Sequence, residues 1–147
     1  MRGEVLDFAA GFTVVDDSYN SNPRSLLSMA RTIAEAREKV KRRIVIAGEM
    51  LELGPDAPSM HREAGKEIAR LGVEVLWGVR GLAKEIIAGA AEAGFTDARF
   101  FESSDEAAAA AVAEIREDDL VLVKGSRSVE TDKVVRALKE KFPLAGQ

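Results

Sequence analysis

FTVVDDSYNSNP, residues 12–23, joins an apolar run of four residues to a polar segment of eight, and a long amphipathic stretch follows. Pro23 suits the first position of a helix, and Asn22 can cap that helix. The junction therefore predicts a strand that passes directly into a helix. Open α/β sheets bind ligands at the carboxyl ends of their strands, and a plain turn needs far fewer polar residues. We expect the segment to recognise a polar ligand; the alternative is an elaborate helix cap.

Outward from this junction, strand and helix periodicities alternate along the chain. Residues 4–8 predict a short edge strand that turns at Gly11 into the strand over 12–16. The periodicity then predicts helices over residues 23–40, 59–71, 82–93, 104–115 and 129–141, and strands over residues 43–47, 73–77, 98–101 and 120–123. This alternation indicates an α/β fold: a Rossmann-like, open, mostly parallel sheet of about six strands with helices on both faces. The N-terminal strand can form an antiparallel edge.

The composition fits one domain. A chain of 147 residues can bury a sizeable core, and no linker is visible, so residues 1–147 are read as a single domain. The absence of cysteine excludes disulfides and thiolate metal sites, and no apolar run of signal-peptide type precedes the first charges. These features favour a cytoplasmic location.

The charge pattern argues against nucleic-acid and membrane partners. The formal net charge is −4, and no apolar stretch approaches the length of about 20 residues that spans a bilayer. A basic cluster lies between a helix and a strand and is more typical of a solvated helix end than of an anion site: Lys39, Lys41, Arg42 and Arg43. With a single His, we expect no metal site.

Two further loops at the carboxyl ends of strands carry candidate groups. The loop over residues 48–58 (GEMLELGPDAP) is long for its type and contains Glu49, and His61 follows it. A lone His there is more typical of a structural hydrogen-bond partner, for example of a loop carboxylate, than of a catalyst. In KGSR (residues 124–127), Lys124, Arg127 and the N–H groups of the next helix would suit a phosphate or carboxylate; simple capping is the alternative.

Several nucleotide and nucleophile motifs are missing from the sequence. There is no GxxxxGK[ST] phosphate loop, no GxGxxG after the first strand, no nucleophile elbow and no thiol. Without these motifs, we do not expect the chain to bind the phosphates of a nucleotide by itself. We therefore interpret the polar edge as half of a site whose other half is supplied elsewhere.

Four motifs, in this order, resemble the C-terminal domain of the Mur ligases, and the resemblance covers nearly the whole chain. RGE (2–4) is similar to the segment that joins the central and C-terminal domains, and DDSYNSNP is similar to DDSYNANP. GEMLELG (48–54) with His61 resembles GDMxELG and its following His, and DLVLVKGSR (119–127) resembles the closing strand and loop. The resemblance is greatest to the ligases that add D-alanyl-D-alanine. Glu49 in place of Asp and Ser21 in place of Ala are departures.

The resemblance implies ATP-dependent amide bond formation in peptidoglycan precursor synthesis, with roles in cell wall, cell shape and cell division. The carboxylate of the UDP-N-acetylmuramoyl tripeptide is phosphorylated, and the amine of D-alanyl-D-alanine attacks the acyl phosphate. The N-terminal and central domains, which this chain lacks, would hold the tripeptide and most of the ATP and Mg²⁺. This domain would close over them on a hinge and be inactive alone.

The resemblance also implies roles for individual residues. Arg2 would reach the ATP phosphates or ribose, and Asp17 would accept hydrogen bonds from the ribose hydroxyls. The full ATP-binding set would be Arg2, Asp17 and Asn20. The substrate-binding set would be Tyr19, Asn20, Asn22, Lys124, Ser126 and Arg127. Glu49 and His61 would support the site, and no residue of this domain alone would be catalytic.

Other functions stay open at this point. The chain could belong to another Mur-type or folylpolyglutamate-type ligase. A phosphorelay receiver domain shares the outline of Asp16, Asp17 and Lys124, but the third helix-flanked strand ends in Trp77 and Gly78 with no aspartate to phosphorylate. A non-catalytic assembly module would use the polar edge to bind a partner protein.

Overall fold

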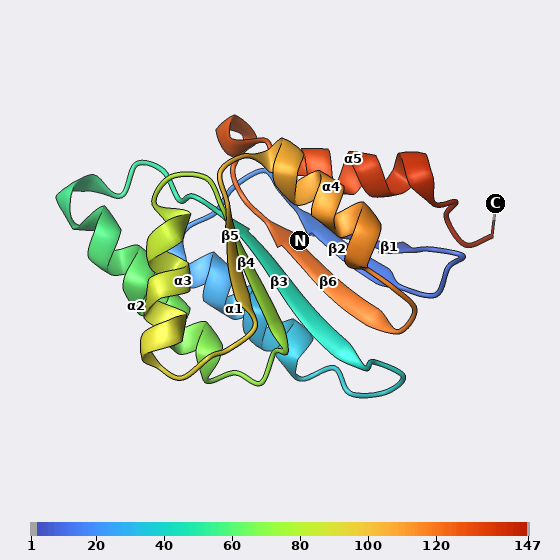
Figure 1. Cartoon of the computed structure of the whole chain (residues 1–147), viewed down its shortest axis with the longest axis horizontal. Coiled ribbons are helices and arrows are strands. Elements are labelled where there is room, and N and C mark those ends of the chain that lie inside the picture. The colour runs from blue at the N-terminus through green and yellow to red at the C-terminus, as the bar shows by residue number, and fades with distance from the viewer. Residues whose placement is uncertain (1–2, 147) are drawn as a thin grey trace.

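The computed structural model describes residues 3–146, which form one mixed sheet of six strands flanked by helices (Figure 1). The strand order is β1-β2-β6-β3-β4-β5, with β1 antiparallel to β2 and all other neighbours parallel. The strands are β1 (Glu4–Asp7), β2 (Thr13–Asp17), β3 (Arg42–Gly48), β4 (Val75–Val79), β5 (Ala98–Phe101) and β6 (Asp119–Lys124). The predicted α/β class and the antiparallel N-terminal edge are confirmed.

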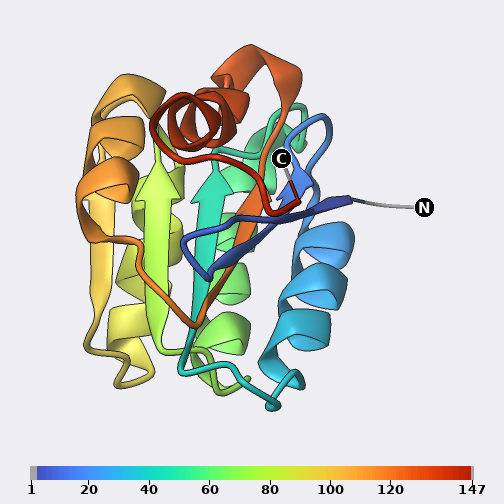
Figure 2. The same ribbon diagram turned by 90° about the vertical axis from the view of Figure 1, so that its right-hand side faces the viewer.

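The helices cover both faces of the sheet (Figures 1 and 2). They are α1 (Pro23–Ala34), α2 (Ala57–Ala69), α3 (Ala83–Glu92), α4 (Ser104–Glu114) and α5 (Asp132–Lys141). Because successive strand residues point to opposite faces, β3 sends Val45 toward α1, α2 and α3, and Ile44 and Ile46 toward α4 and α5. Two apolar cores result, one on each face. Among the described residues, none of the helices has the length and apolarity to cross a bilayer.

Two helix boundaries differ from the predicted ones by more than two residues. The first helix was predicted over 23–40 but ends at Ala34. The guanidinium of Arg43 donates a hydrogen bond to the carbonyl of Ala36 at 2.7 Å. Lys39 has a left-handed φ of 63°, which is incompatible with a right-handed helix. The last helix was predicted from residue 129 but begins at Asp132, after a turn of 3₁₀ helix and a left-handed residue, Glu130.

The amino edge of the sheet, where the parallel strands begin, carries paired charges. Arg42 donates two hydrogen bonds to Asp119, at 2.8 and 2.6 Å, and the hydrogen bond with Asp119 raises the pKa of Arg42. Arg43 donates to both carboxylate oxygens of Glu74, each at 3.0 Å. The expected solvated helix end is correct for the exposed Lys39 and wrong for Arg43, which is buried by this pairing.

Candidate functional site

A cleft of about 720 Å³ opens at the carboxyl edge of the sheet. One wall is the first loop, residues 18–22 between β2 and α1, and the other belongs to the second loop, residues 49–56 between β3 and α2. The lining residues are Gly3, Glu4, Asp16, Asp17, Tyr19, Asn20, Ser21, Asn22, Ser25, Leu51, Glu52, Leu53 and Lys124. Four of the residues proposed from the polar segment therefore meet at one cleft, together with Lys124.

Asp17 and Lys124 lie at the inner end of this cleft and pair with each other. They are opposite residues of the neighbouring strands β2 and β6, and Lys124 Nζ lies 3.2 Å from Asp17 Oδ2. Lys124 is 1% exposed and Asp17 is 8% exposed. The Lys124 ammonium also donates to the main-chain carbonyl of Asn20. The two charges thus form a buried ion pair, although Asp17 Oδ2 accepts no hydrogen bond from the described residues.

Tyr19, Asn20 and Asn22 lie nearer the solvent. Tyr19 is 67% exposed, and the guanidinium of Arg127 lies 5.2 Å from its ring centroid. Asn22 caps α1, as predicted: its Oδ1 accepts from the N–H of Ser25 at 2.9 Å, and the Ser25 hydroxyl accepts from the Asn22 N–H at 3.2 Å. The cap holds Asn22 at the cleft, so its structural role and its proposed ligand role are compatible.

The last loop, residues 125–131 between β6 and α5, differs from its prediction. Its N–H groups were expected at a helix start, ready for an anion. Instead the N–H of Arg127 donates to the Tyr19 carbonyl at 3.0 Å, and those of Val129 and Glu130 donate to the Ser126 carbonyl. These three N–H groups are therefore taken up by a 3₁₀ turn and by the first loop, and the anion contacts expected of Lys124, Ser126 and Arg127 stay a prediction. The buried Ser126 hydroxyl has no hydrogen-bond partner among the described residues.

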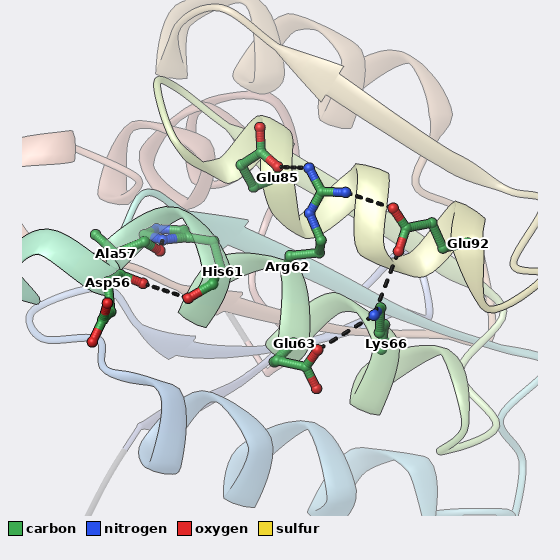
Figure 3. Close-up of polar contacts among 9 residues, drawn as sticks. Asp56, Ala57, His61, Arg62, Glu63, Lys66, Glu85 and Glu92 are labelled. Carbon is green, nitrogen blue, oxygen red and sulfur yellow. Dashed lines mark hydrogen bonds and ion pairs between the residues drawn. The ribbon is translucent and has the colours of Figure 1, made fainter.

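His61 braces the second loop from beneath. Its ring is fully buried; Nε2 accepts from the N–H of Met50 at 2.9 Å, and Nδ1 donates to the Ala57 carbonyl at 2.7 Å. Figure 3 shows the ring beside Ala57 at the start of α2. The predicted structural role is confirmed, but the partners are main-chain groups rather than a loop carboxylate, because the loop folds its backbone onto the ring.

Glu49 also acts as a support. Its Oε2 accepts from the N–H of Leu82 at 2.9 Å, which ties the second loop to the start of α3. A Cβ on Gly81 would lie 2.2 Å from the same carboxylate oxygen, so a side chain there would displace the Glu49 carboxylate from this position. Arg80, in the same connection, donates to the Ser128 carbonyl at 2.9 Å. The loops at this edge are thus linked to one another by side chains.

The helices behind the second loop are also locked together. Arg62 of α2 contacts Glu85 and Glu92 of α3, and Lys66 lies between Glu92 and Glu63 (Figure 3). The backbones themselves touch: a Cβ on Gly65 would meet a carbonyl oxygen of α3 at 1.9 Å, and a Cβ on Gly89 would meet one of α2 at 1.9 Å. The position of α2, and of the loop before it, follows from this crossing.

Sequence reasoning pointed to the second loop but missed its two leucines, Leu51 and Leu53, as part of the cleft. Leu51, Glu52 and Leu53 form the wall opposite the first loop, and Glu52 has a left-handed φ of 61°. The length of the second loop was the signal that could have led to them. Arg2 lies outside the described residues. Within residues 3–146, no group of three or more His, Asp or Glu side chains is placed to hold a metal ion.

The curated relatives are ligases of one kind. The UDP-N-acetylmuramoyl-tripeptide–D-alanyl-D-alanine ligase of Mycobacterium tuberculosis (strain H37Rv) is 35% identical over 156 residues, covering 93% of this chain and 30% of the relative. The enzyme of the same name from Bacillus subtilis (strain 168) is 28% identical, covering 95% of this chain and 31% of the relative. The chain spans about a third of the length of the curated relatives it matches.

Solved structures and a family model agree with this fold. A MurF ligase from Thermotoga maritima in complex with ADP superposes with a TM-score of 0.78 at 19% identity, covering 96% of this chain and 31% of that one. A MurF from Acinetobacter baumannii gives a TM-score of 0.80 at 22% identity, covering 94% of this chain and 30% of that one. The family model described as Mur ligase, glutamate ligase domain, matches residues 1–127, and the chain therefore belongs to this family.

Proposed function

We propose that this chain is the C-terminal, substrate-positioning domain of an ATP-dependent ligase of the cytoplasm. The ligase would add D-alanyl-D-alanine to the UDP-N-acetylmuramoyl tripeptide in peptidoglycan precursor synthesis. The observation that carries the proposal is the cleft of about 720 Å³, lined by the polar segment after β2. The names of the curated relatives support the choice of reaction.

The proposed task of this domain is alignment. Amide bond formation from an acyl phosphate requires the amine to lie against the acyl carbon while water is excluded, and closure of one domain over another supplies both. ATP and Mg²⁺ would be held mainly by residues outside this chain. Arg2 and Asn20 would reach the nucleotide from this side, as would Asp17 through Oδ1, since its Oδ2 faces Lys124.

The exposed groups of the cleft suit a zwitterionic dipeptide. The carboxamides of Asn20 and Asn22 can donate to its carboxylate and accept from its ammonium group. Beside the cleft, a cavity of about 260 Å³ is bounded by Tyr19, Ser126 and Arg127, and there the guanidinium and the unpartnered hydroxyl would supply contacts to an anionic group. Positive and negative ends of the dipeptide would thus each find a partner.

The proposal is tested by titrating the ¹⁵N-labelled chain with D-alanyl-D-alanine and following amide shifts by NMR. We expect shifts at residues 19–22 and 126–128 at millimolar dipeptide, and much smaller shifts with L-alanyl-L-alanine at the same concentration. Equal responses to both dipeptides, or shifts confined to other surfaces, would contradict the proposal. The chain alone should hydrolyse no ATP, because the nucleotide loses most of its contacts when the other domains are absent.

A second test measures turnover. The chain is fused in place of the corresponding third of the Mycobacterium tuberculosis relative, and ADP release that depends on D-alanyl-D-alanine is followed. Dipeptide-dependent ADP release is the expected result. Dipeptide binding by the isolated chain combined with an inactive but folded fusion would instead favour a non-catalytic binding module.

A further inference from the structure

Lys124 is the most deeply buried charged side chain at the cleft. It ends β6, which lies between β2 and β3 in the centre of the sheet, and its side chain is 1% exposed. A buried ammonium is costly unless its donors are satisfied. Its two contacts, the carboxylate of Asp17 and the carbonyl of Asn20, therefore explain why a lysine is tolerated there.

These contacts belong to a larger set that docks the first loop on the last one. The carbonyl of Asp17 accepts from the N–H of Gly125 at 3.2 Å, and that of Tyr19 accepts from the N–H of Arg127 at 3.0 Å. The carbonyl of Asn20 accepts from the Lys124 ammonium. Among these three bonds to main-chain carbonyls, Lys124 supplies the one side-chain donor, and it holds the residue farthest along the loop.

The direction of these bonds determines which groups face the ligand. Because the carbonyls of the first loop point toward the end of β6, the side chains of Tyr19 and Asn20 are left exposed at the cleft. The ammonium of Lys124 is meanwhile shielded from solvent. It is better placed to hold the loop than to touch a ligand.

We propose that Lys124 is a positioning residue of this cleft: through Asp17 and the Asn20 carbonyl it holds the first loop so that the Tyr19 and Asn20 side chains meet the ligand. This inference rests on the proposed function for the identity of the ligand, D-alanyl-D-alanine. Its geometric part, the restraint of the loop, holds for any ligand of the cleft.

The first experiment tests the restraint without a ligand. Lys124→Met is combined with Asp17→Asn, so that no unpaired carboxylate is left buried. Hydrogen exchange of the Gly125 and Arg127 amides should accelerate about tenfold relative to core amides of β3, as expected for local opening. Lys66→Met, which removes a half-buried lysine of α2 whose ion pairs are with Glu63 and Glu92, is the matched control and should leave both rates unchanged. Unchanged exchange in the double variant would overturn the inference.

The second experiment uses Lys124→Arg, which keeps the charge but not the size of the group. A positioning role predicts altered amide shifts over residues 18–22 without ligand, and affinity for D-alanyl-D-alanine reduced about tenfold or more, because small displacements are costly. Wild-type affinity in this variant would overturn the inference and favour direct charge contact. Asn20→Ala separates the two proposals: if it leaves dipeptide affinity unchanged, the proposed function fails at this cleft whatever Lys124 does.

Discussion

The two edges of the sheet contain the same kinds of charged residues and use them differently. At the amino edge, Arg42 and Arg43 each make two hydrogen bonds to a carboxylate, so both charges are fully engaged. At the carboxyl edge, one buried pair stands behind Tyr19 and Asn20, which stay exposed at a cleft. The proposed ligand site is therefore distinguished by exposed polar groups beside a cleft, and not by charged residue types.

The largest expected effect is at His61, a buried residue that supports the second loop at the carboxyl edge. His61→Ala should lower the free energy of unfolding by about 3 kcal/mol, because it leaves the Met50 amide unpaired and opens a cavity. Urea denaturation measures the change. Ser59→Ala, which removes an exposed hydroxyl on the same helix, is the control and should change stability by less than about 0.5 kcal/mol. Equal stability of His61→Ala and the wild-type protein would mean that the second loop does not depend on His61.

Asp119→Asn tests whether the amino edge is purely structural. Loss of the charge that pairs with Arg42 should cost about 2 kcal/mol of unfolding free energy, yet leave dipeptide affinity unchanged. The neighbouring Asp118→Asn is the matched control: Asp118 forms an exposed pair with Lys41, so the cost should stay below about 0.5 kcal/mol. Altered dipeptide affinity in Asp119→Asn would show that the two edges communicate.

Asn22→Ala and Asn20→Ala separate structural from binding roles within the first loop. Asn22→Ala removes the cap of α1 and should cost about 1 kcal/mol of stability in addition to weakening dipeptide binding. Asn20→Ala should weaken binding and leave thermal unfolding unchanged, because the exposed Asn20 side chain makes no hydrogen bond within residues 3–146. Denaturation and titration of both variants measure these effects. A destabilised Asn20→Ala variant would place that side chain among the structural groups.

The smallest expected effect is the pH dependence of the amino edge. Burial raises the pKa of Glu74, but hydrogen bonds and charge interaction with Arg43 outweigh it, so the pKa lies below the usual 4.5. A lowered folded-state pKa contributes stability above the unfolded-state value, and this is lost as the pH falls through the folded-state pKa. Glu74→Gln should therefore flatten the acid limb of the stability profile by less than about 1 kcal/mol. Superimposable acid limbs for Glu74→Gln and wild type would contradict this.

Local patterns were sufficient for much of the fold. The strand over residues 98–101 and the start of the helix at Ser104 are confirmed to the residue, because the alanine-rich run is a strong helix former and Ser103 caps its start. The end of α1 was wrong because its helical spacing continues past Ala34. Just past its end, the carbonyl of Ala36 accepts a hydrogen bond from Arg43 of the next strand, and such a tertiary contact leaves no trace in periodicity.

The candidate site likewise has a part that local sequence predicted and a part that depends on the tertiary structure. The polar segment after β2 indicated one wall of the cleft from sequence alone. The pairing of Lys124 with Asp17 depends on β2 and β6 being neighbours, and alternating helices and strands do not specify that order. The opposite wall, Leu51 to Leu53, carries two leucines that resemble ordinary core residues, so its place in the cleft follows only from the path of the second loop.

The direct backbone contact between α2 and α3 also affects the position of the second loop. Gly65 and Gly89 leave no side chains between the two helix backbones, and so nothing that could rearrange to absorb an added methyl group. An alanine at either position would push the helices apart, and the second loop would travel with α2. The width of the cleft is thus set partly by two helix residues that do not line it.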